Sequence, residues 1–135
     1  MHKTLKHIVN YKFTIITLLT ILFLSVSSGE NINKPWFLKF ENSDKLVHFG
    51  MYGFLTLIYL MERTRFLRIK IKTKQTRWYF VLWIFITGGI IELLQPLLAE
   101  RQKDIWDFLA NTAGIITAYL VFLLIRRYIK YHWKG

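Results

Sequence analysis

The sequence predicts an all-α integral membrane protein, folded as a bundle of four transmembrane helices. Composition supports this class, because hydrophobic residues make up 53% of the 135 residues and a soluble domain of this length is less hydrophobic. The arrangement of residues supports it further, because the apolar residues fall into long runs that are nearly free of charge, with charged segments between them. The length fits a single domain over residues 1–135.

The predicted helices follow these apolar runs. A helix needs about 20 residues to cross the hydrocarbon layer of a membrane, with a lower limit of about 17. The third and fourth runs satisfy this and contain one charged residue each, Glu92 and Asp107. The first two runs are shorter and need flanking residues to span. We therefore expect four helices, at about residues 12–29, 45–62, 78–99 and 104–126.

The first apolar run also fits a second interpretation. Basic residues precede it, and the small residues from Ser25 to Gly29 follow its apolar part, as in a cleavable signal peptide. Cleavage would leave three spans in the same orientation, so the charge pattern does not distinguish the two interpretations. We expect the run to be retained as a helix, because its uncharged stretch from Phe13 to Gly29 reaches the lower limit for a span.

Lysine and arginine residues predict the orientation of the bundle. Most of the 19 basic residues lie in the N-terminal segment, in the loop 62–77 and in the C-terminal tail, which four spans place on one membrane face. Positive residues stay on the cytoplasmic side, so we expect both termini and this loop to be cytoplasmic. The same bias explains the net charge of +11 without a nucleic-acid partner. We expect the protein to contact the lipid bilayer throughout, and the basic residues 63–77 to contact anionic lipids.

Polar side chains within and beside the predicted spans gather at the opposite, outer face. Such groups are costly inside a membrane and usually face the bundle interior or a wet cavity. Helical spacing places Glu92 and Gln95 on one side of the third helix, and Asp107 and Asn111 on one side of the fourth. We expect one connected polar site at the outer ends of the second, third and fourth helices. Its candidate residues are Asp44, Lys45, His48, Tyr52, Glu92, Gln95, Arg101, Asp104, Asp107 and Asn111.

Small residues continue the polar stripe of the fourth helix toward its middle. Ala110, Gly114 and Ala118 recur every four residues, a spacing that lets two helices approach closely. The stripe is therefore polar at its outer end and suited to close packing further in.

Several of these residues also have a purely structural interpretation. Asp104 suits the N-cap of the fourth helix, and Asp107 lies in its first turn, where a negative charge is favourable. Gln95 and Asn111 can form hydrogen bonds between helices. His48 can be an interfacial histidine bonded to a carbonyl group.

Glu92 is the candidate that packing explains least. It lies about two turns inside the third span, where a carboxylate needs a partner. Arg101, Lys45 or a protonated His48 is the expected cation, and Arg101 suits the role because its planar group can form two parallel hydrogen bonds with a carboxylate.

The sequence gives no positive sign of a cofactor or a metal. It contains no cysteine, no glycine-rich phosphate loop and no nucleophile elbow. His48 and the carboxylates together can bind a divalent cation, but no metal-binding spacing is present. We therefore expect neither a metal nor another cofactor.

Two motifs in this chain resemble those of VanZ-like membrane proteins. The first is Asp44-Lys45-Leu46-Val47-His48-Phe49, with Tyr52 and Leu55 following. The second is Glu92-Leu93-Leu94-Gln95, followed by Arg101, Asp107, Asn111 and Gly114. Together they cover residues 44–118. The chain departs from the family pattern at Pro96, directly after Gln95, and in the gap 96–100, which lacks a Pro-Gly turn.

The resemblance implies a small, multi-pass protein of the bacterial cytoplasmic membrane. The founding member of the family is linked to low-level resistance to the glycopeptide teicoplanin, and the family supplies no settled biochemical activity. Our first functional hypothesis is a non-catalytic envelope protein, whose outer site binds an envelope lipid, a peptidoglycan precursor or a lipophilic glycopeptide and contributes to antibiotic tolerance. In it Arg101, Lys45 and Lys103 would meet phosphate.

The second hypothesis is a membrane-embedded enzyme that acts on a lipid-linked envelope substrate. His48 would be the general acid or base, and Glu92 or Asp107 the carboxylate that orients it. A transporter is a further alternative. Catalytic turnover that is lost on replacing His48 would distinguish the enzyme from the binding protein.

Overall fold

The computed structural model describes residues 9–27, 42–64, 77–98 and 104–132, with the side chains of residues 130–132 left aside. Throughout these ranges the ordered elements are helices, and no strand occurs in them. The elements are α2 (Lys12–Val26), α3 (Ser43–Thr64), the short 3-10 helix η2 (Trp78–Val81), α4 (Leu82–Leu98) and α5 (Ile105–His132). The prediction of an all-α fold is therefore confirmed for the residues that the structure describes.

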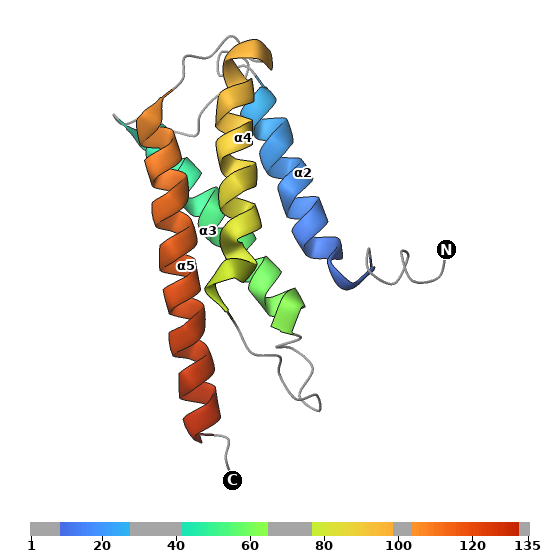
Figure 1. Cartoon of the computed structure of the whole chain (residues 1–135), viewed down its shortest axis with the longest axis vertical. Coiled ribbons are helices and arrows are strands. Elements are labelled where there is room, and N and C mark those ends of the chain that lie inside the picture. The colour runs from blue at the N-terminus through green and yellow to red at the C-terminus, as the bar shows by residue number, and fades with distance from the viewer. Residues whose placement is uncertain (1–8, 28–41, 65–76, 99–103, 133–135) are drawn as a thin grey trace.

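The four α-helices run alternately up and down, side by side (Figure 1). The C-terminal ends of α2 and α4 lie at the same end of the molecule as the N-terminal ends of α3 and α5. We call this the upper end, which contains Val26, Ser43, Leu98 and Ile105, and the opposite one the lower end. The topology brings the beginning of α3, the end of α4 and the beginning of α5 together, although they are far apart in the sequence.

Two of the helical segments have the length and apolar composition of membrane spans, Trp78–Leu97 and Ile105–Ile129. By length and composition these two helices could cross a membrane. α2 has only 15 residues, and α3 has 22 residues with several charged and polar ones among them. Four spans therefore stay a prediction. Pro96, placed at the end of the third expected helix, lies inside α4, which continues to Leu98.

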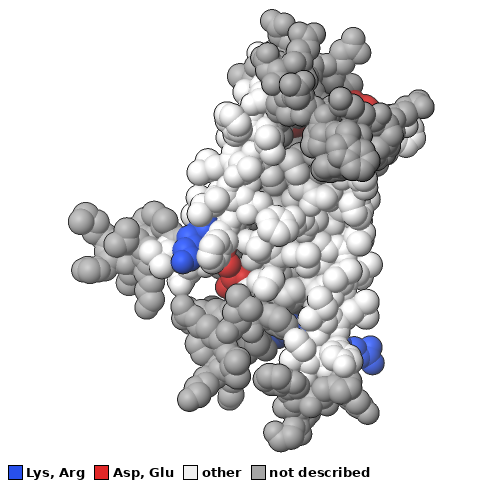
Figure 2. Space-filling view, turned by 180° about the vertical axis from the view of Figure 1, so that it is seen from behind, with Lys and Arg blue, Asp and Glu red and all other residues white. Residues whose placement is uncertain are grey.

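The core and the surface share the same apolar character. Ile21, Leu55, Ile84 and Ile115 pack together with Tyr52 in a buried cluster that joins all four helices. Yet Leu97 on α4 is 79% exposed, and many other large apolar side chains are exposed as well. The face drawn in Figure 2 is dominated by uncharged side chains among the described residues. An apolar surface of this extent is what a membrane lipid environment covers.

The closest packing in the bundle is between α3 and α5, which share the most extensive contact of any helix pair described. The two backbones meet at Gly53 and Gly114. A Cβ atom added at Gly114 would overlap the backbone oxygen of Phe49, and one added at Gly53 would lie 3.4 Å from the backbone oxygen of Gly114. Gly114 and the buried Ala118 belong to the small-residue stripe of the sequence, and the close approach expected of this stripe is confirmed at Gly114.

The lower end is held by a contact between α2 and α3 that the sequence did not reveal. Tyr11 at the N-cap of α2 provides no side-chain hydrogen bond to the helix. Instead, the Glu62 carboxylate of α3 accepts hydrogen bonds from the backbone N–H groups of Phe13 at 3.0 Å and Thr14 at 2.9 Å. The Thr14 hydroxyl donates a third bond at 2.6 Å. An anion supplied by a neighbouring helix thus satisfies the free N–H groups at the start of α2.

Candidate functional site

A buried hydrogen-bonded network lies between α3, α4 and α5 near the upper end. Asn111 of α5 is its centre: its Nδ2 donates to Oε1 of Glu92 on α4 at 2.8 Å, and its Oδ1 lies 3.0 Å from Nδ1 of His48 on α3. Asn111 is 1% exposed, His48 3% and Glu92 8%. Because an amide oxygen only accepts, the proton of this pair belongs on Nδ1 of His48. Three residues from three helices therefore form one network with a defined direction of donation.

The imidazole of His48 lies between two carboxylates. Its Nδ1 is 3.3 Å from Oε1 of Glu92, and its Nε2 is 3.5 Å from Oδ2 of Asp107. Asp107 is 4% exposed, so both carboxylates face the ring from buried positions. Such a ring can hold a proton on both nitrogens, or keep Nε2 available to accept one. The arrangement has the parts of an acid–base pair, with one nitrogen oriented by a partner and the other directed at a carboxylate.

The rim of the network lies closer to the surface and carries a lysine between two acids. Lys45 Nζ is 3.1 Å from Oδ2 of Asp104 and 3.5 Å from Oδ2 of Asp44, and the three side chains are about one-third exposed or less. Asp104 also caps α5, because its Oδ1 accepts the backbone N–H of Trp106 at 2.8 Å. That backbone N–H, together with Lys45, lowers the pKa of the Asp104 carboxyl. The N-cap expected at this position is thus present.

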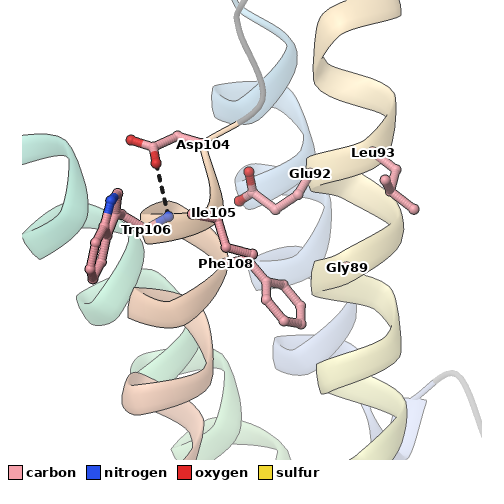
Figure 3. A pocket seen from close by; sticks show the side chains of 7 residues that line it. All are labelled: Gly89, Glu92, Leu93, Asp104, Ile105, Trp106 and Phe108. Atoms are coloured by element: carbon pink, nitrogen blue, oxygen red, sulfur yellow. Dashed lines mark hydrogen bonds between the residues drawn. The ribbon is translucent and has the colours of Figure 1, made fainter.

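A recess of about 570 Å³ opens between α4 and α5 beside the network. Figure 3 shows Glu92 extending from α4 toward α5 and the Phe108 ring directed into the space between them. The wall at Gly89 is close to that ring, since a Cβ there would lie 3.4 Å from it. The lining residues are Gly89, Glu92, Leu93, Asp104, Ile105, Trp106 and Phe108. The recess is therefore apolar except for two carboxylates.

Four buried polar atoms of the predicted site have no hydrogen-bond partner within the described part of the chain: Tyr52 Oη, Glu92 Oε2, Gln95 Nε2 and Asp107 Oδ1. A buried polar group without a partner costs about 1–3 kcal/mol. Folded proteins usually satisfy such groups through water, an ion or a ligand. Their concentration in this one region indicates that the site has hydrogen-bonding capacity for another molecule.

The structure brings together nine of the ten predicted site residues at the upper ends of α3, α4 and α5. Seven of them make the contacts described above. The Tyr52 ring packs against Gly88, one turn below Glu92. Gln95 is on the same helix as Glu92 and is 2% exposed. Arg101 lies outside the described residues, as do Lys103 and most of the basic loop 63–77. The partners described for Glu92 are Asn111 and His48, and His48 is one of the three groups expected beside it. The functional role of the set stays a prediction.

Sequence reasoning missed a second recess, of about 550 Å³, near the lower end. It has aromatic walls from Tyr11, Tyr59 and Trp83, and Arg63 at its edge. Tyr59 stacks with Tyr11 at 5.9 Å between ring centroids and meets Trp83 edge-on at 5.1 Å. Aromatic residues occur in the sequence near the expected helix ends, but their spacing does not predict that side chains of α2 and α3 meet there.

Comparison with known proteins identifies one family. The model of the family described as VanZ/LLP1 matches residues 3–126 of this chain, which is nearly its whole length. The resemblance inferred from the two motifs is thereby confirmed. Neither the curated proteins nor the solved structures gave a significant match.

Proposed function

The chain therefore belongs to the VanZ/LLP1 family, and we propose that it binds an amphipathic lipid-linked molecule of the bacterial envelope at its upper end. One observation carries this proposal: the apolar recess between α4 and α5 includes Glu92 in its wall, and Glu92 is a member of the buried polar network. A ligand with an apolar chain and a polar head would use both parts. Pockets for such ligands are mostly apolar, with a few placed polar groups.

The exposed apolar residues of the recess suit a ligand that enters from the membrane. Leu93 is 60% exposed, Ile105 64% and Trp106 62%, so the recess is bordered by side chains that prefer lipid. The chain of the ligand would lie against these residues, and its head would approach Glu92 and Asp104. The partnerless oxygen atoms Glu92 Oε2 and Asp107 Oδ1 would accept hydrogen bonds from water around the head or from hydroxyl and amide groups attached to it, and Lys45 is the described cation that could meet a phosphate there.

The proposed orientation has four spans, cytoplasmic termini and an outward-facing upper end. The support is the distribution of charge: Arg63, Arg77, Arg126 and Arg127 lie in the lower half of the described chain, and Lys45 lies at its upper end. This matches the cytoplasmic excess of basic residues in membrane proteins. Reporter fusions at Lys70 test it, because a fusion there that works only outside the membrane would contradict the orientation. An outward site can meet peptidoglycan precursors or a lipophilic glycopeptide, and so influence antibiotic tolerance.

Filling the recess tests the binding proposal. Gly89→Leu adds a side chain beside the Phe108 ring, whereas Gly50→Leu makes the same replacement at a position where the added Cβ meets no atom within 4 Å apart from its own helix backbone and its chain neighbours. Both purified variants would be mixed with a polyprenyl phosphate and examined by native mass spectrometry. We expect Gly89→Leu to lose about tenfold or more in bound lipid, a change of about 1.4 kcal/mol, while Gly50→Leu binds as the unaltered protein does. Equal binding by the two variants would contradict the proposal.

The second candidate function is catalysis on such a lipid. The observation that favours it is the environment of His48, whose Nδ1 is oriented by Asn111 while its Nε2 faces Asp107. This geometry is that of a positioned general acid or base. Purified protein would be incubated with lipid-linked envelope substrates, and product measured. Turnover that is lost in His48→Gln, with lipid binding retained, would favour the enzyme; binding without turnover favours the binding protein.

A further inference from the structure

Three carboxylates lie together at the upper end, on the solvent side of the His48 network. Asp44 of α3, together with Asp104 and Asp107 at the beginning of α5, place one carboxylate oxygen each within 4.8 Å of one another. Two oxygen atoms bound to one Ca²⁺ ion at about 2.4 Å can lie at most about 4.8 Å apart. The three side chains are therefore close enough together to contribute oxygen atoms to one calcium coordination shell. Mg²⁺ binds at about 2.1 Å and demands near-ideal octahedral geometry, so a set of protein carboxylates suits it less well than it suits Ca²⁺.

A second observation points to a bound cation independently of this spacing. Asp107 is 4% exposed, and its Oδ1 has no hydrogen-bond partner among the described residues. A carboxylate oxygen is rarely buried in this way, because it loses its hydration and gains nothing in return. Its neighbours from the cluster are carboxylates, so the missing partner of Asp107 has to be positively charged or a donor.

The position of Lys45 shows where positive charge is held in this cluster. Its ammonium group contacts Asp44 and Asp104 at 3.5 and 3.1 Å. One ammonium group does not balance the negative charge of this site. The described residues here provide four carboxyl groups, those of Glu92 and the three aspartates, and the positive groups are Lys45 and, at most, a protonated His48. Two negative charges remain within the described part of the chain. A divalent ion offsets that remainder provided that the Lys45 ammonium group, when displaced from the carboxylates, stays close to the site.

We propose that Asp44, Asp104 and Asp107 bind a hard divalent cation of the size of Ca²⁺, which takes the place of the Lys45 ammonium group. The donors are all carboxylate oxygens, which favour Ca²⁺, Mg²⁺ or Mn²⁺ over softer metals. His48 Nε2, 3.5 Å from Oδ2 of Asp107, positions that carboxylate from behind. Because Asp104 also lines the apolar recess, the ion lies at its mouth. There the ion and the released Lys45 hold the phosphate of an anionic lipid head, a consequence that rests on the proposed function.

Terbium luminescence tests the cation site without any lipid. Tb³⁺ substitutes for Ca²⁺ and emits when a nearby tryptophan is excited, and Trp106 lies between Asp104 and Asp107 in the sequence. The full chain in detergent would be titrated with Tb³⁺, and the ion then displaced with Ca²⁺ or Mg²⁺. We expect saturable emission, displacement by Ca²⁺ at lower concentration than by Mg²⁺, and weaker emission from Trp106→Phe. Absence of saturable emission and of calorimetric Ca²⁺ binding would overturn the proposal.

Matched variants assign the site to these residues. Asp44→Asn and Asp104→Asn should each weaken affinity for Ca²⁺ by about tenfold or more, and asparagine at position 104 retains the helix cap. Lys45→Met should strengthen affinity, because it removes the competing ammonium group. Glu62→Gln, at the lower end, serves as the control for a general loss of negative charge and should leave the affinity unchanged. An affinity that is unaffected by Asp44→Asn and Asp104→Asn, or equally reduced by Glu62→Gln, would overturn the assignment.

A lipid measurement separates this inference from the proposed function. Native mass spectrometry with polyprenyl phosphate would be run with Ca²⁺ and with a chelator. We expect the chelator to release the lipid, in step with loss of Ca²⁺. Lipid binding in a protein that never binds Ca²⁺ would overturn the cation site and leave the proposed function standing. Ca²⁺ binding without any lipid binding would support the cation site and contradict the proposed function.

Discussion

Asn111 connects the buried network through the two ends of one amide group. Its Nδ2 donates to Glu92, and its Oδ1 faces His48. A carboxylate at this position would offer only acceptors and a hydrocarbon neither donor nor acceptor, so only an amide serves both neighbours. With 1% of its surface exposed, Asn111 has no water to substitute for either partner.

Replacing Asn111 with aspartate exchanges one side-chain atom, the Nδ2 that donates to Glu92, for an oxygen. Asn111→Asp keeps the shape of the side chain, removes the donor to Glu92 and brings another carboxylate next to it. We expect a loss of about 2–4 kcal/mol in the free energy of unfolding at neutral pH, because a buried charge is left uncompensated. Thermal unfolding of the purified protein in detergent would measure it. An unchanged melting temperature would show that the amide does not hold Glu92.

The Asp104 carboxyl group should make the stability of the fold depend on pH. The backbone N–H of Trp106, with Lys45, holds the pKa of this carboxyl below its usual range. A lowered carboxyl pKa stabilises the fold above the pKa of the unfolded chain, and the contribution is lost as the pH falls through the folded value. We expect stability to decline as the pH falls below about 4, and Asp104→Asn to show a smaller decline. Melting temperatures measured between about pH 6 and about pH 3 would reveal it, and parallel curves for both proteins would contradict it.

At the scale of the helices, the crossing of α3 and α5 positions the site. His48 and Asn111 lie on these two helices, about one turn above the glycines where the backbones meet. Close approach at Gly53 and Gly114 is what lets their side chains reach each other at hydrogen-bond distance. The small-residue stripe is therefore part of the site's construction, although it contains no polar group.

A methyl group at the crossing should separate the helices. Gly114→Ala would push the added carbon into the backbone of α3 at Phe49, and we expect a loss of about 1–3 kcal/mol in unfolding free energy from the forced separation. Gly50→Ala is the control, since the Cβ meets nothing within 4 Å and alanine favours a helix over glycine by about 1 kcal/mol. The control should be neutral or more stable. If Gly114→Ala were as stable as Gly50→Ala, the close crossing would be wrong.

The complete bundle shows which structural features could be predicted from the sequence and which could not. Helix positions and the gathering of polar residues at one end could be predicted, because apolar runs, charge and helical spacing are local properties. The partners of particular side chains could not. The sequence offers Arg101, Lys45 and a protonated His48 as partners for Glu92, and His48 does lie 3.3 Å from it, but the hydrogen bond from Asn111 to Glu92 follows from no local pattern. Glu62 caps a different helix. Such pairings depend on how the helices rotate and cross, which no local pattern specifies.

Site-specific photo-crosslinking shows most directly whether lipid binds beside the polar network. A photoreactive residue in place of Leu93 would lie in the lining of the recess, and one in place of Leu120 would lie on α5 outside it. The native side chains are 60% and 53% exposed, so bulk lipid reaches both positions. Each protein would be placed in bilayers with a small proportion of labelled polyprenyl phosphate. We expect strong labelling at position 93, weak labelling at position 120, and loss of the difference in Gly89→Leu. Equal labelling at the two positions would contradict it.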